Sequence, residues 1–154
     1  MRPWHVSLLA LLLVGCDHGT KLAAARLLGD GPRSLIANVL ELRYAENHDI
    51  AFSALSALHL PTPRAALIVV GLLVLAALVF SFRSLRNGDR RSDVGFTLVV
   101  AGAVGNLLDR IFRGYVVDFV HLAHWPVFNV ADVLIAVGGI LLATSLVPKK
   151  RAAP

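Results

Sequence analysis

The sequence has few charged residues and a single cysteine. Only 16% of its 154 residues are charged, whereas soluble domains average about 25%. Because 56% of the residues are hydrophobic and the mean hydropathy is +0.70, one small soluble core could not bury so much apolar surface. The lone Cys16 excludes an internal disulfide framework. These shortages favour an integral membrane protein, which we expect to be a single domain over residues 1–154.

Several kinds of functional motif are also missing. The sequence contains no glycine-rich phosphate loop and no motif typical of a serine nucleophile. His121 and His124 form a His-x-x-His pair without an evident third ligand, so we expect no metal. The net charge of +5 does not indicate a nucleic-acid partner, because the basic residues cluster at the ends of apolar runs. The positive-inside rule accounts for that clustering.

Four apolar segments predict four transmembrane helices, at about residues 4–28, 65–82, 94–112 and 129–148. The first uncharged run, Pro3 to Cys16, has only 14 residues, so it spans the membrane only if the helix continues past Asp17. Two alternatives remain open for this run. It could be a cleavable signal peptide, or Leu13 to Cys16 could be a lipobox that makes the chain a lipoprotein itself.

The distribution of basic residues predicts the topology. Four arginines between Arg83 and Arg91 mark a cytoplasmic loop at about residues 83–92, and Lys149 to Arg151 lie at the same side. Both termini are then cytoplasmic. Residues 29–64 form a small non-cytoplasmic subdomain on the membrane, with short strands expected within Leu35 to Tyr44. The predicted fold class is an all-α polytopic membrane protein carrying this outer subdomain.

Asp118 and Asp132 are the candidate catalytic residues. Ionisable groups at the edge of a membrane span are costly, so they are functional candidates, and the predicted topology places both at the same non-cytoplasmic level. Two neighbouring acids can share one proton, because like charges resist joint ionisation. The ionised acid can activate water while the protonated acid donates to the scissile carbonyl. The residues alone do not establish that the two side chains meet.

Polar residues also recur at helical spacing in three segments of the chain, one of which contains Asp132. Asn129 lies three residues before Asp132, and Arg110 can present a planar fork to substrate carbonyls. Asp17, Lys21 and Asp109 fit either substrate contact or structural ion pairs that fix helix ends. Asn47 fits either substrate binding or the capping of a turn.

Two other function classes compete with an enzyme. In a small proton-coupled transporter, the acids would form a relay along a path through the bilayer. In an inactive or specialised relative of an enzyme, the same pocket would only bind a lipopeptide or an inhibitor.

Five short motifs, in order along the chain, resemble the prolipoprotein signal peptidase family, signal peptidase II. The motifs are DHGTK at residues 17–21, EN with AFS at residues 46–47 and 51–53, GNLLDR at residues 105–110, VVDF at residues 116–119, and WPVFNVAD at residues 125–132. The resemblance covers most of the chain.

This resemblance implies an aspartyl endopeptidase of the bacterial inner membrane. It would remove the signal peptide from diacylglyceryl-modified prolipoproteins at the periplasmic face, cutting just before the lipidated cysteine. The residues that match its functional positions are the catalytic pair Asp118 and Asp132, the substrate-binding Asn47, Asn106, Arg110 and Asn129, and the supporting Asp17, Lys21, Asp109, Phe52 and Ala131.

The resemblance further implies a monomer without a cofactor, whose partners are the prolipoprotein and membrane lipid. It also implies an extended cradle and a short helix within Gly29 to Arg64. One segment diverges from the family pattern, because Asp49 and Ile50 stand where a glycine and a small residue are usual. We expect these two residues to alter the substrate range or the response to inhibitors.

Overall fold

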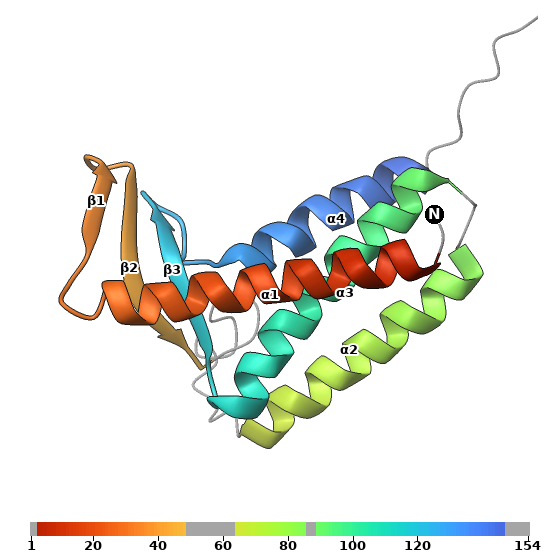
Figure 1. The fold of residues 1–154 in the computed structure, drawn as a ribbon, viewed down its shortest axis with the longest axis horizontal. Coiled ribbons are helices and arrows are strands. Elements are labelled where there is room, and N and C mark those ends of the chain that lie inside the picture. The colour runs from red at the N-terminus through yellow and green to blue at the C-terminus, as the bar shows by residue number, and fades with distance from the viewer. Residues whose placement is uncertain (1–2, 49–63, 86–88, 147–154) are drawn as a thin grey trace, which may run out of the picture.

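The computed structural model describes residues 3–48, 64–85 and 89–146 of the chain. Within them, four helices lie together and a small sheet covers one end of the helical part (Figure 1). The elements are α1 (Pro3–Leu27), β1 (Arg33–Ile36), β2 (Leu40–Asn47), α2 (Arg64–Leu85), α3 (Arg90–Phe112), β3 (Val116–Leu122) and α4 (Val130–Leu146). Phe52, Asp49, Ile50 and the short helix expected in the outer segment lie outside the described residues.

Helices α1, α2 and α3 are long and apolar enough to cross a membrane, whereas the apolar stretch of α4 is shorter, at Val130–Ser145. Helix α1 continues past Asp17 as far as Leu27, which is the condition that the sequence set for its crossing. Cys16 is exposed on this helix. The four helices overlap the four predicted apolar segments, while the membrane spans themselves, their bounds and their count stay predictions.

Glycines bring α3 and α4 into close contact. A Cβ atom on Gly138 would lie 2.6 Å from the backbone oxygen of Gly95, and one on Gly102 would lie 2.4 Å from that of Ala131. Small residues permit such close approach between helices in lipid. The contact at Ala131 fixes the first turn of α4 beside the carboxyl-terminal half of α3.

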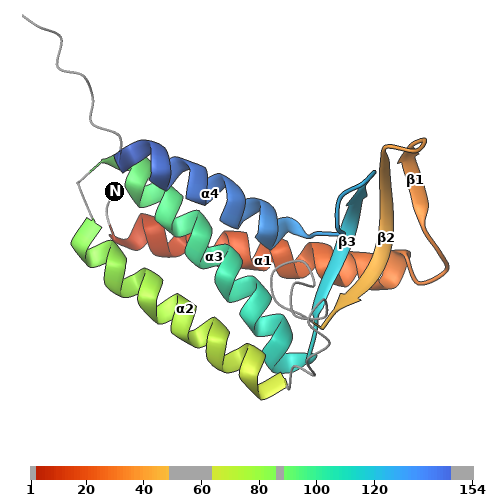
Figure 2. The same cartoon turned by 180° about the vertical axis from the view of Figure 1, so that it is seen from behind.

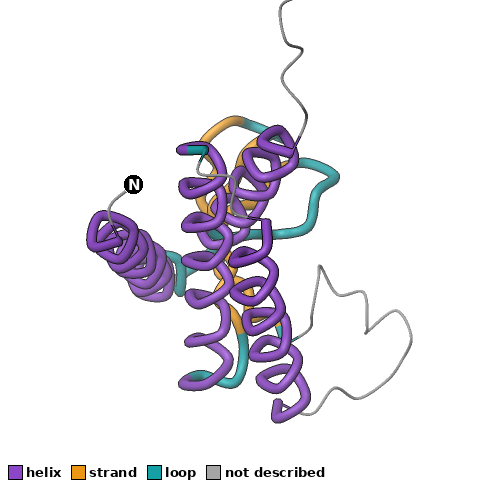
Figure 3. Tube along the Cα trace, turned by 90° about the vertical axis from the view of Figure 1, so that its right-hand side faces the viewer, coloured by secondary structure: helices purple, strands orange, loops and turns teal. Residues whose placement is uncertain are grey.

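The helix ends that do not connect to the sheet lie together at one end of the bundle. The start of α1, the end of α2, the start of α3 and the end of α4 all lie away from the sheet (Figures 1 and 2). The segments that connect to the sheet lie at the opposite end. Figure 3 shows that α1 stands apart from the other helices over its first turns.

The sheet is antiparallel with the strand order β1-β2-β3. Its first two strands fall where the sequence predicted extended structure. The third strand, β3, comes from the loop between α3 and α4 and therefore from outside the predicted outer segment. The register sets Ala45 opposite Asp118 and Asn47 opposite Val116. Asn47 therefore lies beside β3, the strand that contains Asp118.

Candidate active site

Asp132 lies in the first turn of α4, where it takes part in a reciprocal cap. The backbone N–H of Asn129 donates to Asp132 Oδ2 at 3.1 Å, and the backbone N–H of Asp132 donates to Asn129 Oδ1 at 3.1 Å. This is the pattern of a capping box, here formed by Asn and Asp. The N–H of Ala131 between them donates to Asp17 Oδ1 of α1 at 2.9 Å. The start of α4 is thus capped by its own residues and by α1.

Asp118 lies on β3 and is only 3% exposed. Two amides donate to its carboxylate, Asn47 Nδ2 at 2.9 Å and Asn129 Nδ2 at 2.6 Å. Burial raises the pKa of Asp118 to about 6, and the negative charge of Asp132 adds to this rise, whereas the two amides oppose it. Desolvation disfavours the charged form of a carboxyl, so Asp118 retains a proton at a higher pH than an exposed aspartate does.

Two asparagine amides connect the carboxylates. Asn106 Nδ2 donates to Asp132 Oδ1 at 2.9 Å. Asn129 Nδ2 donates both to Asn106 Oδ1, at 3.1 Å, and to Asp118 Oδ1. Each of the four carboxylate oxygens of Asp118 and Asp132 therefore accepts one N–H, which fixes the positions of both acids.

A buried ion cluster lies behind these amides, formed by Asp17, Lys21 and Asp109, whose side chains are fully buried. Lys21 Nζ lies 2.8 Å from Asp17 Oδ2 and 3.0 Å from Asp109 Oδ2, and it donates to Asn106 Oδ1 at 3.0 Å. Of the two alternatives that the sequence left open for Asp17 and Lys21, the structure contains the ion pair. Buried charges need such pairing, because an uncompensated charge is strongly destabilising.

Asp109 also fixes the connection from α3 to β3. It accepts the backbone N–H of Val117 at 3.2 Å and pairs with Arg113. Arg64, the first residue of α2, donates to the backbone oxygens of Arg110 and Ile111 at the end of α3. These contacts hold the end of α3 against β3 and against the start of α2.

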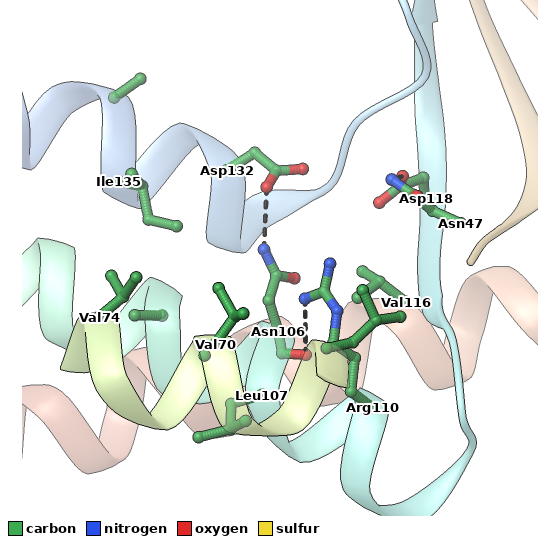
Figure 4. Close-up of a pocket in the computed structure, with 14 residues that line it drawn as sticks. Asn47, Val70, Val74, Asn106, Leu107, Arg110, Val116, Asp118, Asp132 and Ile135 are labelled. Carbon is green, nitrogen blue, oxygen red and sulfur yellow. Dashed lines mark hydrogen bonds between the residues drawn. The ribbon is translucent and has the colours of Figure 1, made fainter. Parts of the chain in front are cut away.

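A cavity of about 390 Å³ opens over the two acids. In Figure 4, Asp132 and Asp118 face each other across it, and the guanidinium of Arg110 points into the space between them. The cavity has a polar end and a longer apolar part. It is lined by Asn47, Leu67, Val70, Gly71, Val74, Ala103, Asn106, Leu107, Arg110, Val116, Asp118, Asp132, Ile135 and Ala136.

Comparison with known proteins identifies the family. The sequence profile of the family described as signal peptidase (SPase) II matches residues 9–147. The chain belongs to the signal peptidase II family. It is 41% identical to the lipoprotein signal peptidase of Caldicellulosiruptor bescii over 87% of its own length and 84% of the relative's. It is 36% identical to that of Geobacter metallireducens, over 98% and 96% of the two chains.

The fold is also that of a solved bacterial membrane enzyme. That structure superposes with a TM-score of 0.81 at 25% identity, covering 97% of each chain. A second bacterial membrane enzyme superposes with a TM-score of 0.80. The helices and the sheet of this signal peptidase II chain are therefore arranged as in the two solved membrane enzymes.

The structure of this signal peptidase II chain gathers the predicted site residues in one place. Asp118, Asp132, Asn47, Asn106 and Arg110 line the cavity, and Asn129 bridges two of them. The predicted supporting residues lie behind this layer, with Ala131 contributing its backbone N–H to Asp17. Phe52 lies outside the described residues. The functional roles of all these residues stay predictions.

Two features were not predicted from the sequence. Arg64 clamps the end of α3, although the sequence marks it only as a basic residue before an apolar run. The apolar wall of the cavity comes from residues of α2, α3 and α4 whose types do not distinguish them in the sequence from lipid-facing residues. Within the parts of the chain that the structure describes, no three His, Cys, Asp or Glu side chains lie close enough together to hold a metal.

Proposed function

We propose that this signal peptidase II chain hydrolyses the bond before the lipidated cysteine of a diacylglyceryl prolipoprotein, with Asp118 and Asp132 as its catalytic pair. One observation carries the proposal: both carboxylates line the same cavity, although 13 positions separate them on two different elements. Each also accepts hydrogen bonds from neutral amides, which hold both side chains in place.

The proposed reaction divides the work between the two acids. The ionised carboxylate takes a proton from a water molecule, whose oxygen attacks the scissile carbonyl carbon. The protonated carboxyl donates its proton to the carbonyl oxygen. When the tetrahedral intermediate collapses, the C–N bond breaks, the leaving nitrogen takes the proton that the first carboxylate received from water, and a hydroxyl of the intermediate returns its proton to the second carboxylate. The two acids titrate as a coupled pair.

The lining of the cavity supports a substrate that is polar at one end and apolar along the rest. Arg110 and Asn47 can bind the peptide backbone near the acids. The apolar part, formed by residues such as Val70, Val74 and Ile135, suits acyl chains or the apolar segment of a signal peptide.

We further propose four membrane spans, cytoplasmic termini and a periplasmic active site in a monomeric enzyme. The arginine-rich segment after α2 and the basic tail support this orientation. The arrangement in Figure 1 also supports it, because β3 and the start of α4, which carry the two acids, lie at the end of the bundle opposite to the start of α1 and the end of α2.

The test is cleavage of a purified diacylglyceryl prolipoprotein by the wild type, Asp118→Asn and Asp132→Asn. We expect cleavage by the wild type before the modified cysteine and a loss of at least about 1,000-fold in either variant. Asp30→Asn is the matched control, because Asp30 is exposed in the turn after α1. Full activity in either dyad variant would exclude this mechanism, and binding without cleavage by the wild type would instead identify an inactive lipopeptide-binding relative.

A further inference from the structure

The contacts around Lys21 reach the candidate catalytic pair through one side chain. Lys21 has three N–H donors and no acceptor. Its Nζ forms ion pairs with Asp17 Oδ2 and Asp109 Oδ2, at 2.8 and 3.0 Å, and donates a hydrogen bond to Asn106 Oδ1 at 3.0 Å. The first two contacts neutralise charge. The third is directed at a neutral amide that itself donates to Asp132.

From these contacts we propose that Lys21 is a positioning residue, which fixes the orientation of the Asn106 amide and thereby aims its N–H at Asp132. If the amide were reversed, Asn106 Nδ2 would face the ammonium of Lys21 and Asn129 Nδ2, and donors would meet donors. The oxygen would then face Asp132 Oδ1, and acceptor would meet acceptor. Lys21 therefore allows only one orientation.

The same constraint reaches Asp118 through Asn129. The Asn129 oxygen is already engaged with the N–H of Asp132, so the Asn129 amide donates toward the other two partners. One of these partners is Asn106 Oδ1, which Lys21 keeps in place, and the other is Asp118 Oδ1. The ammonium of Lys21 thus directs the side-chain N–H of Asn106 at Asp132 and, through Asn106, the side-chain N–H of Asn129 at Asp118.

Lys21 also acts on Asp118 through its charge. Among the described residues, the charged groups that act on Asp118 or respond to it are Asp132 on α4, Lys21 on α1 and Arg110 on α3. The positive charge of Lys21 lowers the pKa of Asp118, against the larger rise caused by burial. Loss of Lys21 should therefore raise the pKa of Asp118 and move the alkaline decline of kcat/KM to a higher pH. A purely structural role for Lys21 would not shift this decline.

Arg113 provides the matched control. It pairs with the same acid, Asp109, as Lys21 does, but among the described residues it makes no hydrogen bond to Asn47, Asn106 or Asn129. Lys21→Met and Arg113→Met each remove one cation from Asp109. If Lys21 only holds helices together, the two variants will differ in stability alone.

The experiment measures kcat, KM and their pH dependence for Lys21→Met, Arg113→Met, Asn106→Ala and Lys21→Met/Asn106→Ala on a diacylglyceryl prolipoprotein. We expect Lys21→Met to lower kcat up to about 100-fold with KM within about threefold. Arg113→Met should keep kcat within about threefold of the wild type and leave the pH profile unchanged. With kcat compared at the optimal pH of each variant, so that the charge effect on Asp118 does not enter, the double variant should be no slower than the slower single variant, because Lys21 positions Asp132 through Asn106.

Multiplicative losses in the double variant, or equal behaviour of Lys21→Met and Arg113→Met, would overturn the inference. If Lys21→Met fails to fold because two acids are left buried, Asp17→Asn/Lys21→Met removes one of them and is tested in the same way against Asp17→Asn. The inference rests on the proposed function, but the two can fail separately. An inactive wild type, or an active Asp118→Asn, refutes the function, whereas a normal wild type with an unimpaired Lys21→Met refutes only the positioning role.

Discussion

Asp17 in the middle of α1 accepts the backbone N–H of Ala131 in the first turn of α4, at 2.9 Å and across 114 residues of sequence. The first N–H groups of a helix have no partner within the helix, and here a carboxylate from another helix supplies one. Asp17 also holds Lys21. One side chain therefore connects the buried ion cluster to the turn that carries Asp132.

Gly105→Ala should disrupt this connection. A Cβ atom at Gly105 would lie 2.5 Å from Asp17 Oδ2, so the Asp17 carboxylate must shift, which disturbs its contacts with Lys21 and with the N–H of Ala131. We expect a loss of about 1–3 kcal/mol in the free energy of unfolding and a fall in kcat of up to about 100-fold. Thermal unfolding and prolipoprotein cleavage in detergent measure the two effects.

Gly19→Ala is the control for this prediction. A Cβ atom at Gly19 on α1 meets nothing within 4 Å, and alanine is the better helix former by up to about 1 kcal/mol. This variant should be active and at least as stable as the wild type. If Gly105→Ala behaved in the same way, the close approach of Gly105 to Asp17 would be irrelevant to the enzyme.

Asp118→Asn should change how stability depends on pH. The pKa of Asp118 is raised from 3.8 to about 6 in the folded protein, so the folded state binds the proton more tightly than the unfolded state. The wild type therefore loses stability as the pH rises from about 4 to above 6, by about 3 kcal/mol at 1.36 kcal/mol per pH unit. The variant lacks this loss.

The difference in unfolding free energy between Asp118→Asn and the wild type should therefore grow in favour of the variant between pH 4 and pH 7.5. Thermal or denaturant unfolding at a series of pH values measures it. Asp30→Asn, at an exposed position, should show no such trend. A difference that stays constant over this range would mean that the carboxyl of Asp118 titrates normally.

Asn47→Ala should shift the pH profile of catalysis. The amide of Asn47 donates to Asp118 Oδ2 at 2.9 Å and lowers the pKa of that carboxyl. Without the amide, Asp118 should hold its proton to a still higher pH than about 6. Because kcat/KM reports the free enzyme, its decline on the alkaline side should begin at a higher pH than in the wild type. An unchanged profile would show that this hydrogen bond does not influence the proton of the pair.

Ala136→Leu should impair substrate binding. Ala136 lines the apolar part of the cavity, and a larger side chain there takes up space that we assign to the substrate. We expect KM to rise roughly tenfold or more with a smaller change in kcat. Ala143→Leu is the control, because Ala143 is exposed on the same helix and does not line the cavity. Equal KM values for the two variants would place the substrate elsewhere.

The helices were predictable because membrane insertion imposes a simple requirement on the chain. A helix that crosses a bilayer needs about 20 apolar residues in succession, and such runs are visible in the sequence as α2 and α3. Whether α1 is long enough to cross a membrane depended on whether the helix continues past Asp17. A charge in the middle of an apolar run could end the helix or remain within it, and pairing with Lys21 in the adjacent turn allowed it to remain.

The sequence by itself determined a membrane protein with apolar helices, a small extended segment and a set of polar residues at helical spacing. Only the tertiary structure decided that Asn47 lies beside Asp118, across 71 residues, and that Lys21 reaches Asn106, across 85. The physical reason is that spacing along a helix or a strand fixes only which residues share a face. Which faces meet depends on close packing, here on the glycines between α3 and α4 and on the register of β2 with β3.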